Sequence, residues 1–357
     1  MLQSRFSEVC PLKAVTPYSS QHDKAFWRRA VSNRHFGDIA DVFPPIPDLR
    51  TSRIATGGSC FAQHIGRQLK LRGLAFIDCE PRPSIVPEWQ AARFGYGVYS
   101  CRYGNIYTVR QLLQLFEEAY EERTPAEIAW HKEGRVYDAL RPGVFEDGFS
   151  SFEELKEMRC GHLARCRAMF EELEIFVFTL GLTEAWLSAT DGTVYPTAPG
   201  VIAGSYDAGN YKFINFEFID VYRDLELFIT KLRAVNANAR MILTVSPVPL
   251  AATATDDHVV VATTYSKSVL RSVAGEISKK LPGVFYFPSY ELISSHIARG
   301  MFYNPDLREV NSFGVREVMK HFFGDETASS TQVKGEPADN GLDMDAYVQC
   351  EESLING

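Results

Sequence analysis

Short apolar runs alternate with longer amphipathic stretches between about residues 53 and 323 of the chain. This alternation is typical of α/β proteins, in which a helix that covers the sheet follows each buried strand. The runs predicted to be strands are Arg53–Thr56, Leu74–Asp78, Ile175–Leu180, Met241–Val245 and Val284–Phe287. The third and fourth runs are apolar throughout, so we expect them at the centre of a parallel sheet whose two faces are both covered.

The stretches between these runs predict helices. Apolar side chains follow a helical period over residues 108–121, and Ser151 with Glu154 three residues later forms the pattern of a capping box. Further helices are predicted at residues 25–31, 63–72, 218–235, 266–281 and 313–323. Five strands, each followed by a helix, predict one doubly wound domain.

Two long segments rich in Pro and Gly, 79–107 and 196–215, interrupt this rhythm, and we expect them to be binding loops or lids. The rest of the chain divides by composition. We predict an N-terminal extension over residues 1–50 that packs on the body, an α/β domain over 51–324, and an acidic, disordered tail over 325–357.

The negative charge is concentrated in that tail. The chain has 357 residues, with 37 Lys+Arg and 45 Asp+Glu, for a net charge of −8. Residues 325–357 hold eight acids and one base, which accounts for −7 and leaves the rest of the chain at −1. A near-neutral body argues against nucleic acid or an anionic membrane surface as the partner, because both select clustered Lys and Arg.

Composition also limits the compartment and the kinds of site. No apolar run approaches the roughly 20 residues that span a bilayer, and residues 1–15 lack the apolar core of a signal peptide, so we expect no membrane span and a cytoplasmic location. The seven cysteines include no C-x-x-C pair, which argues against a disulfide framework or a zinc ribbon. Cys160, His162 and Cys166 would scatter around a helix, so we expect no metal site there.

Candidate chemistry follows the first predicted strand, because ligands bind outside the carboxyl ends of the strands in an open parallel sheet. Gly57-Gly58-Ser59-Cys60 lies between that strand and the next helix. Two glycines permit a tight turn, and the N–H groups at the start of a helix can stabilise an oxyanion. Ser59 is therefore a candidate nucleophile and Cys60 a competing one; the alternative is an ordinary turn with an N-cap serine.

Several ordered motifs resemble those of a known family. GSCFA at 58–62 looks like the name-giving motif of the GSCFA domain family, which belongs to the broader SGNH (GDSL-type) hydrolase group. Other matching stretches are YGNIYTVRQLL at 103–113, TLGLTEAW at 179–186, LTVSPVPL at 243–250, YSKSVLR at 265–271 and FPSYEL at 287–292. The resemblance runs from about residue 50 to 323 and implies a three-layer α/β/α domain with a short parallel sheet of about five strands in flavodoxin-like order.

The resemblance also implies an esterase-like or acyl-transferring site. Gly57-Gly58-Ser59 is similar to the Gly-Asp-Ser of SGNH enzymes, which points to Ser59 as the nucleophile, with Gly58 at the Asp position and the backbone of residues 58–60 at the oxyanion. Gly181-Leu182-Thr183 resembles their Gly-x-Asn block, so Thr183 would be an oxyanion donor, with Glu184 beside it. The alternative for both residues is a capped turn after a buried strand.

The chain departs from the pattern in the last block. SGNH enzymes show Asp-x-x-His before the final helix, whereas this chain reads Asp306-Leu307-Arg308-Glu309. A serine nucleophile needs a group that takes its proton. Substitutes are His258 on the loop after residues 241–245, His64 close behind Ser59, and Glu309 if it is buried; the alternative for each is an ordinary surface residue.

Two further features could contact a ligand. Tyr103, Asn105 and Tyr107 combine ring faces with polar groups and would suit a sugar or an acyl group, or else form a tyrosine-rich structural loop. Lys267 would either meet a phosphate or be solvated.

Two functions follow from these features. The first is an SGNH-like esterase or O-acyltransferase that acts on a carbohydrate or glycan precursor through a Ser59 acyl-enzyme; it requires no cofactor, and acyl-CoA could serve as acyl donor. The alternative is a non-catalytic protein that binds a glycan or a partner and keeps the fold without the usual Asp-x-x-His base.

Overall fold

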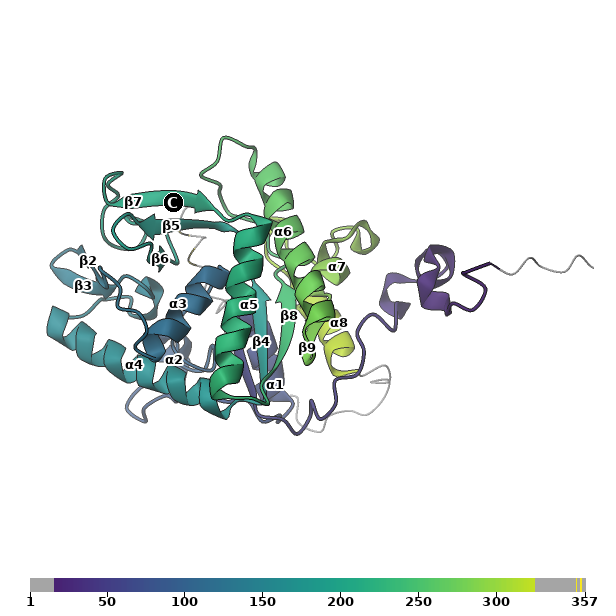
Figure 1. Cartoon of the computed structure of the whole chain (residues 1–357), viewed down its shortest axis with the longest axis horizontal. Coiled ribbons are helices and arrows are strands. Elements are labelled where there is room, and N and C mark those ends of the chain that lie inside the picture. The colour runs from purple at the N-terminus through teal and green to yellow at the C-terminus, as the bar shows by residue number, and fades with distance from the viewer. Residues whose placement is uncertain (1–15, 325–350, 352–353, 355–357) are drawn as a thin grey trace, which may run out of the picture. The chain divides into compact units, whose positions relative to one another are not determined.

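The structure is a computed structural model that describes residues 16–324, Glu351 and Leu354 (Figure 1). The chain divides into two compact units, with the boundary between Val42 and Phe43. The unit that begins at Phe43 contains the α/β domain, and the two units are described separately.

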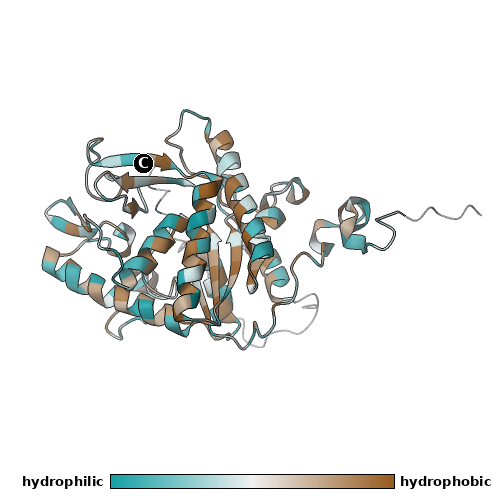
Figure 2. Ribbon diagram, in the orientation of Figure 1, coloured by the Kyte–Doolittle hydropathy of each residue, from teal (hydrophilic) through white to brown (hydrophobic). Residues whose placement is uncertain are grey.

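A parallel sheet forms the centre of the α/β domain. Among the described residues it has four strands, in the spatial order β1 (Ile54–Gly58), β4 (Ile175–Leu180), β8 (Arg240–Val245) and β9 (Val284–Phe287). The two runs that are apolar throughout, in β4 and β8, are the inner strands, as predicted. Figure 2 shows these strands coloured mostly as hydrophobic, which fits a sheet covered on both faces.

The predicted strand Leu74–Asp78 is reduced to a single bridge between Phe76 and Ile54. The next donor on that edge of β1, the amide of Thr56, is occupied by the Ser100 hydroxyl at 3.0 Å, so pairing cannot continue along the edge. The prediction of a fifth strand was therefore wrong in extent. The bridge lies on the edge of β1 that faces away from β4. This segment, the second in the chain, is therefore outermost, as strand 2 is in the flavodoxin-like order 2-1-3-4-5.

Helices cover both faces of the sheet and complete three layers (Figure 1). One face carries α3 (Val109–Ala119), α4 (Phe152–Glu172), α5 (Phe218–Val235) and α6 (Val259–Lys280), and the other carries α1 (Phe61–Leu71), α7 (Ser289–Ser294) and α8 (Ser312–Phe323). Ser151 caps α4 by accepting from the amide of Glu154, as predicted. Helix α6 begins at Val259 instead of Ser266, which places Lys267 in its interior.

Two small antiparallel sheets were not predicted. One is the hairpin β2 (Ala129–Lys132) and β3 (Arg135–Asp138); the other has β5 (Glu184–Ser188) between β6 (Val194–Tyr195) and β7 (Tyr211–Asn215). Strand β7 occupies part of the predicted loop 196–215. The predicted loop 79–107 contains the short helix α2 (Glu88–Ala91) and is otherwise largely irregular.

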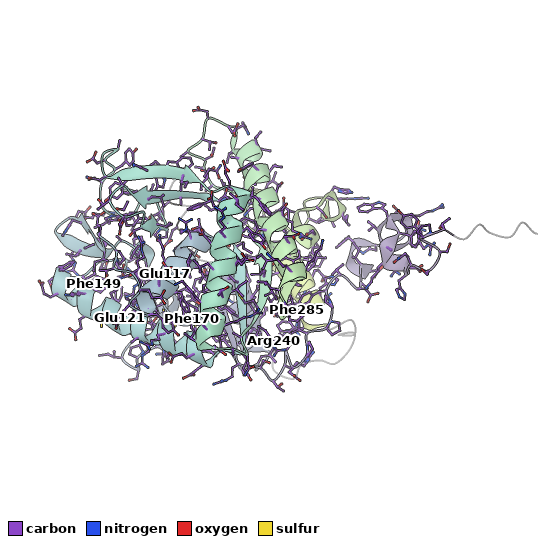
Figure 3. All side chains as sticks on the ribbon, in the orientation of Figure 1. Glu117, Glu121, Phe149, Phe170, Arg240 and Phe285 are labelled. Carbon is purple, nitrogen blue, oxygen red and sulfur yellow. The ribbon has the colours of Figure 1, made fainter. Side chains whose placement is uncertain are left out.

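Aromatic side chains fill the space between the sheet and the helices on one face. Figure 3 labels Phe170, which belongs to this group. Its ring lies 5.1 Å from that of Phe116, 6.0 Å from that of Phe176 and 5.9 Å from that of Phe228, measured between centroids. These rings join α3, α4 and α5 to β4, so the core holds the inner strand that leads to the site. Over the described ranges, no helix combines the length and the apolar character that crossing a membrane requires.

The ends of the predicted domain differ from the expectation in two places. Residues 43–50, assigned to the extension, belong to the α/β domain, where Ile46 and Leu49 are buried. None of residues 16–42 is buried, and their packing on the body stays a prediction. In the predicted tail, Glu351 is buried and accepts a hydrogen bond from the amide of Gly143 at 3.2 Å. Apart from Glu351 and Leu354, the tail lies outside the described residues.

Candidate functional site

The carboxyl ends of three parallel strands meet at one small cavity. Ser59, Gly181 and Ser246 are the first residues after β1, β4 and β8, and all three line this space, together with Cys60. Its volume is about 10 Å³, which is the space of about one water molecule. We call it the serine cavity; it lies at the sheet edge where the sequence predicts the site.

Glycines bring the backbone close together at this edge. Gly58 has φ +129°, and a Cβ at Gly58 would lie 2.3 Å from the carbonyl oxygen of Thr179, so only glycine fits. A Cβ at Gly181 would lie 3.0 Å from the Cβ of Ser59. The turn after β1 therefore packs Ser59 directly against the turn after β4.

Ser59 is 3% exposed, and its Oγ has no hydrogen-bond partner within the part of the chain that the structure describes. A buried polar atom without a partner is costly, and a catalytic role is one of the reasons for which such a group is kept. The amide of Ser59 donates to the carbonyl oxygen of Thr179 at 3.1 Å. That bond corrects one expectation, because the amide of Ser59 is not directed towards an oxyanion.

Lys267 brings an amine to the same cavity from α6. The side chain is 2% exposed, and Nζ donates to the carbonyl oxygen of Gly181 at 2.6 Å. Of the two alternatives for Lys267, the solvated one was therefore wrong. A signal existed within the predicted helix, because Lys267 lies at helical spacing with the buried residues Leu270 and Ala274.

The predicted bases do not line the serine cavity. His258 is exposed and caps α6, with Nδ1 accepting a backbone N–H at 3.2 Å. Asp306 accepts the amide of Glu309 at 3.1 Å, and both side chains are exposed. His64 is buried instead of on the surface, and burial, together with the Arg67 charge, lowers its pKa to about 4.

Tyr103 and Asn105 take part in hydrogen bonds that hold β1 and the turn after it. The Tyr99 hydroxyl lies 2.5 Å from Asn105 Oδ1 and 3.2 Å from the carbonyl oxygen of Ser59. The buried Tyr103 hydroxyl donates to the carbonyl oxygen of Thr56 in β1. Neither residue lines the serine cavity, so the structure does not bring them to a ligand there.

Tyr107 and Thr183 hold the chain that follows β4. Tyr107 lines the serine cavity, and its carbonyl oxygen accepts the amide of Gly181 at 3.1 Å. Thr183 is fully buried, and its hydroxyl donates to Asn215 Oδ1 at 2.6 Å. The Thr183 hydroxyl is therefore committed to β7, and it does not line the serine cavity.

A larger space, which we call the apolar cavity, adjoins the serine cavity. Its volume is about 210 Å³, and Tyr107, Leu182 and Leu250 form part of the wall of both spaces. Glu184 also lines it, with its carboxylate accepting the hydroxyl of Thr253 at 2.6 Å. Glu184 therefore ties the loop after β8 to β5.

The sequence model of the GSCFA family matches residues 53–322, which run from the residue before β1 into the last turn of α8. The chain belongs to the GSCFA family. A search of curated proteins finds no match. Both cavities lie within the stretch that matches the GSCFA family, so the site belongs to the shared domain and not to the flanking segments.

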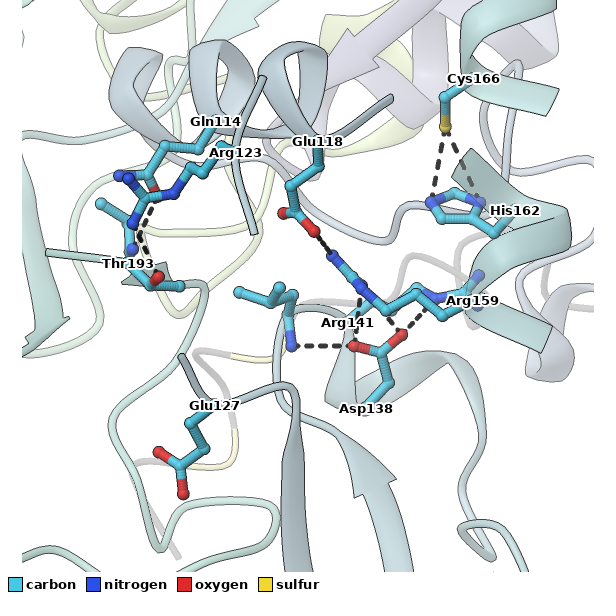
Figure 4. Close-up of polar contacts among 12 residues, drawn as sticks. Gln114, Glu118, Arg123, Glu127, Asp138, Arg141, Arg159, His162, Cys166 and Thr193 are labelled. Carbon is cyan, nitrogen blue, oxygen red and sulfur yellow. Dashed lines mark hydrogen bonds and ion pairs between the residues drawn. The ribbon is translucent and has the colours of Figure 1, made fainter. Parts of the chain in front are cut away.

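The GSCFA domain buries a second cluster of polar groups, shown in Figure 4. Asp138 accepts from Arg141 Nε at 2.7 Å and from Arg159 Nη1 at 3.0 Å, and Arg159 also pairs with Glu118. Burial alone would raise the pKa of the Asp138 carboxyl, but Arg159 and Arg141 lower it below its usual value. The charges neutralise one another and join α3, β3 and α4, which indicates a structural role.

A thiol, an imidazole and a carboxylate lie in a row beside this cluster. Cys166 Sγ lies 3.5 Å from His162 Nε2, and His162 Nδ1 lies 2.7 Å from Glu80 Oε2. This order resembles an activated thiol, but Cys166 is 0% exposed and lines neither named cavity. Cys160 is exposed, so the two cysteines do point to different sides of the helix. Within the described ranges, no set of three His, Cys, Asp or Glu side chains is placed to hold a metal ion.

Proposed function

We propose that the protein is a serine esterase or O-acyltransferase of the SGNH type that forms an acyl ester on Ser59. The observation that carries this proposal is the pairing of a buried serine hydroxyl with a buried amine in one cavity. The Ser59 hydroxyl has no partner in the described structure, and Lys267 lines the same space. A serine hydroxyl and a general base that line one cavity can act together as an activated nucleophile.

Lys267 takes the place of the missing Asp-x-x-His base. Ser59 Oγ attacks the ester carbonyl carbon, the bond from that carbon to the leaving oxygen breaks, and the serine proton passes through Lys267 Nζ to the leaving oxygen. The step requires Nζ of Lys267 to accept a proton, which buried lysines in other proteins do where burial disfavours the charged amine. The carbonyl oxygen of Gly181 orients Nζ. Water or an acceptor hydroxyl then attacks the acyl-enzyme in the same manner.

The proposed oxyanion donor lies at the start of α1. The amide of Ser59 donates to the carbonyl oxygen of Thr179, so the amide of Phe61, the first residue of α1, is assigned this role. The first N–H groups of a helix have no acceptor within the helix, and the helix dipole favours negative charge there.

The proposed acceptor is a hydroxyl group of a carbohydrate or glycan precursor. The rings of Trp186 and Tyr206 lie 5.1 Å apart, and Tyr206 is exposed, so an aromatic surface flanks the apolar cavity that Trp186 lines. Ring faces with a polar edge suit a sugar. The reaction requires no cofactor, and acyl-CoA could serve as donor in a transfer.

Labelling with a fluorophosphonate tests the nucleophile. We expect the reagent to modify Ser59 in the wild type, with the site read by peptide mass spectrometry, and to leave Ser59→Ala unmodified. Ser205→Ala, at an exposed serine, is the matched control and should label like the wild type. Cys60→Ser should label too, whereas loss of labelling in that variant would return the role to the thiol.

The second function, a protein that binds a glycan or a partner without turnover, is favoured by one observation. Asp306 and Glu309, at the place of the usual base, are exposed and apart from the serine cavity. If Ser59→Ala labels as strongly as the wild type, or the wild type neither labels nor hydrolyses an aryl acetate, the binding function replaces the enzyme.

A further inference from the structure

The apolar cavity adjoins the nucleophile. It shares Tyr107, Leu182 and Leu250 with the serine cavity, so a group attached to a carbonyl at Ser59 would extend directly into it. Its volume of about 210 Å³ can be compared with the 150 Å³ apolar cavity that accommodates a benzene molecule in another protein. By that scale it holds about eight carbon atoms.

The walls of this cavity are mostly apolar. The antiparallel sheet of β5, β6 and β7, the loop between β6 and β7, and the loop after β8 supply the side chains Ala185, Trp186, Pro196, Val201, Phe213 and Ala252. Burying an alkyl chain against such a surface is favourable because it removes apolar surface from water.

Two polar side chains of the wall, Gln111 and Glu184, are engaged within the protein. Gln111 accepts the amide of Tyr107 and donates to the carbonyl oxygen of Asn105, each at 2.9 Å. Glu184 accepts the hydroxyl of Thr253 at 2.6 Å. A sugar in this space would leave hydroxyl groups without hydrogen-bond partners, which costs free energy. An alkyl chain has no hydrogen bonds with water to lose.

Thr197 brings a polar atom to the wall. Thr197 is 5% exposed and lines the cavity, and its Oγ1 has no hydrogen-bond partner within the described residues. It can meet a single oxygen on an otherwise apolar ligand.

We propose that the apolar cavity binds the acyl chain of the substrate, a medium-length chain of up to about eight carbons, while the carbonyl carbon meets Ser59. Thr197 then faces one polar substituent of that chain. This inference rests on the proposed function of Ser59, because it assigns the substrate of the same site.

Binding of octanoate tests the cavity without catalysis. In the Ser59→Ala protein, octanoate should change the tryptophan fluorescence in a saturable manner, and Trp186→Phe should remove the change because Trp186 lines the cavity. Ala198→Phe fills the cavity and should weaken binding by about tenfold, as should Ala252→Phe from another part of the wall. Ala208→Phe, on the exposed part of the same loop, is the matched control and should bind like the parent. Saturable binding of N-acetylglucosamine in place of octanoate would overturn the inference.

The chain-length profile tests the assignment to the substrate. With p-nitrophenyl esters from acetyl to dodecanoyl, kcat/KM should rise to a maximum near octanoyl, and Ala198→Phe should lower the octanoyl-to-acetyl ratio by about tenfold. Hydrolysis that is fastest for acetyl, with no octanoate binding, refutes the acyl cavity and leaves the Ser59 enzyme intact. Octanoate binding without hydrolysis of any ester refutes the enzyme and leaves an apolar ligand site.

Discussion

Lys267 donates a hydrogen bond from Nζ to the carbonyl oxygen of Gly181 at 2.6 Å, and Gly181 in turn packs against Ser59. The three residues come from α6, from the end of β4 and from the end of β1. Lys267 therefore lies on the crossover helix between β8 and β9. The expected histidine would instead have lain at residues 306–309, before the last helix. This relationship gives the site its first test.

Replacing Lys267 by Met keeps the length of the side chain and removes the base. We expect kcat/KM for an aryl acetate to fall by about 10²- to 10⁴-fold, the usual contribution of general base catalysis. Lys279→Met, on the exposed face of the same helix, should retain wild-type kinetics. The folded fraction of each variant is checked by circular dichroism, and a folded, fully active Lys267→Met protein would exclude the lysine as base.

Gly58 fixes the turn, and we expect Gly58→Ala to be severely destabilised. The alanine would hold φ +129° and place its Cβ 2.3 Å from the carbonyl oxygen of Thr179, so the paired strands β1 and β4 would have to separate. Strain of this kind costs about 1–3 kcal/mol before the clash is counted. Urea unfolding measures the change.

Gly73 provides the control for that variant. It has φ +65°, but nothing lies within 4 Å of the position that a Cβ would take, so Gly73→Ala should cost only about 1 kcal/mol. Equal losses in the two variants would show that the contact with Thr179 does not matter.

The central sheet and the place of Ser59 follow from local signals. Residues 175–180 and 241–245 are continuous apolar runs, and a run of that kind needs cover on both faces wherever it occurs. Ser151 caps its helix through a bond to Glu154, three residues away, so neighbouring sequence suffices. Gly58 likewise indicates a turn from the local sequence alone.

The position of Lys267 inside a longer helix was harder to predict. Helix α6 begins with Val259, Val260 and Val261, and because β-branched residues are poor helix formers, local preference does not indicate a helix before the predicted start at Ser266. Tertiary packing overrides that local preference. The shortened second strand is similar, because the amide of Thr56 is taken by Ser100, whose arrival at that edge no local pattern reveals.

The cluster around Asp138 should contribute to stability more than a surface pair does. Asp138→Ala leaves Arg141 and Arg159 buried without their shared carboxylate, and breaking a buried ion pair in this way costs about 3–5 kcal/mol. Denaturant unfolding monitored by fluorescence gives the difference.

Glu146→Ala is the matched control for Asp138→Ala. Glu146 pairs with Arg93 on the surface, where both side chains are about half exposed, so its loss should cost less than about 1 kcal/mol. If Asp138→Ala lowered the free energy of unfolding no more than Glu146→Ala does, the buried cluster would not be a structural element of the domain.

His64 should make the domain less stable in mild acid. Burial first, and then the charge of Arg67, lowers the pKa of His64 from 6.5 to about 4 in the folded state. Below about pH 6.5 the unfolded chain therefore binds a proton that the folded protein excludes. As the pH decreases from about 6.5 to about 4, the free energy of unfolding decreases by about 3 kcal/mol. Glu80, whose pKa is about 2 despite its burial because His162 lies beside it, loses its own contribution to stability mainly at lower pH.

His64→Gln should flatten the pH dependence of the free energy of unfolding between about pH 7 and pH 4.5, measured by urea unfolding. His131→Gln, at an exposed position, should keep the wild-type slope. An unchanged slope in His64→Gln would mean that another group excludes the proton.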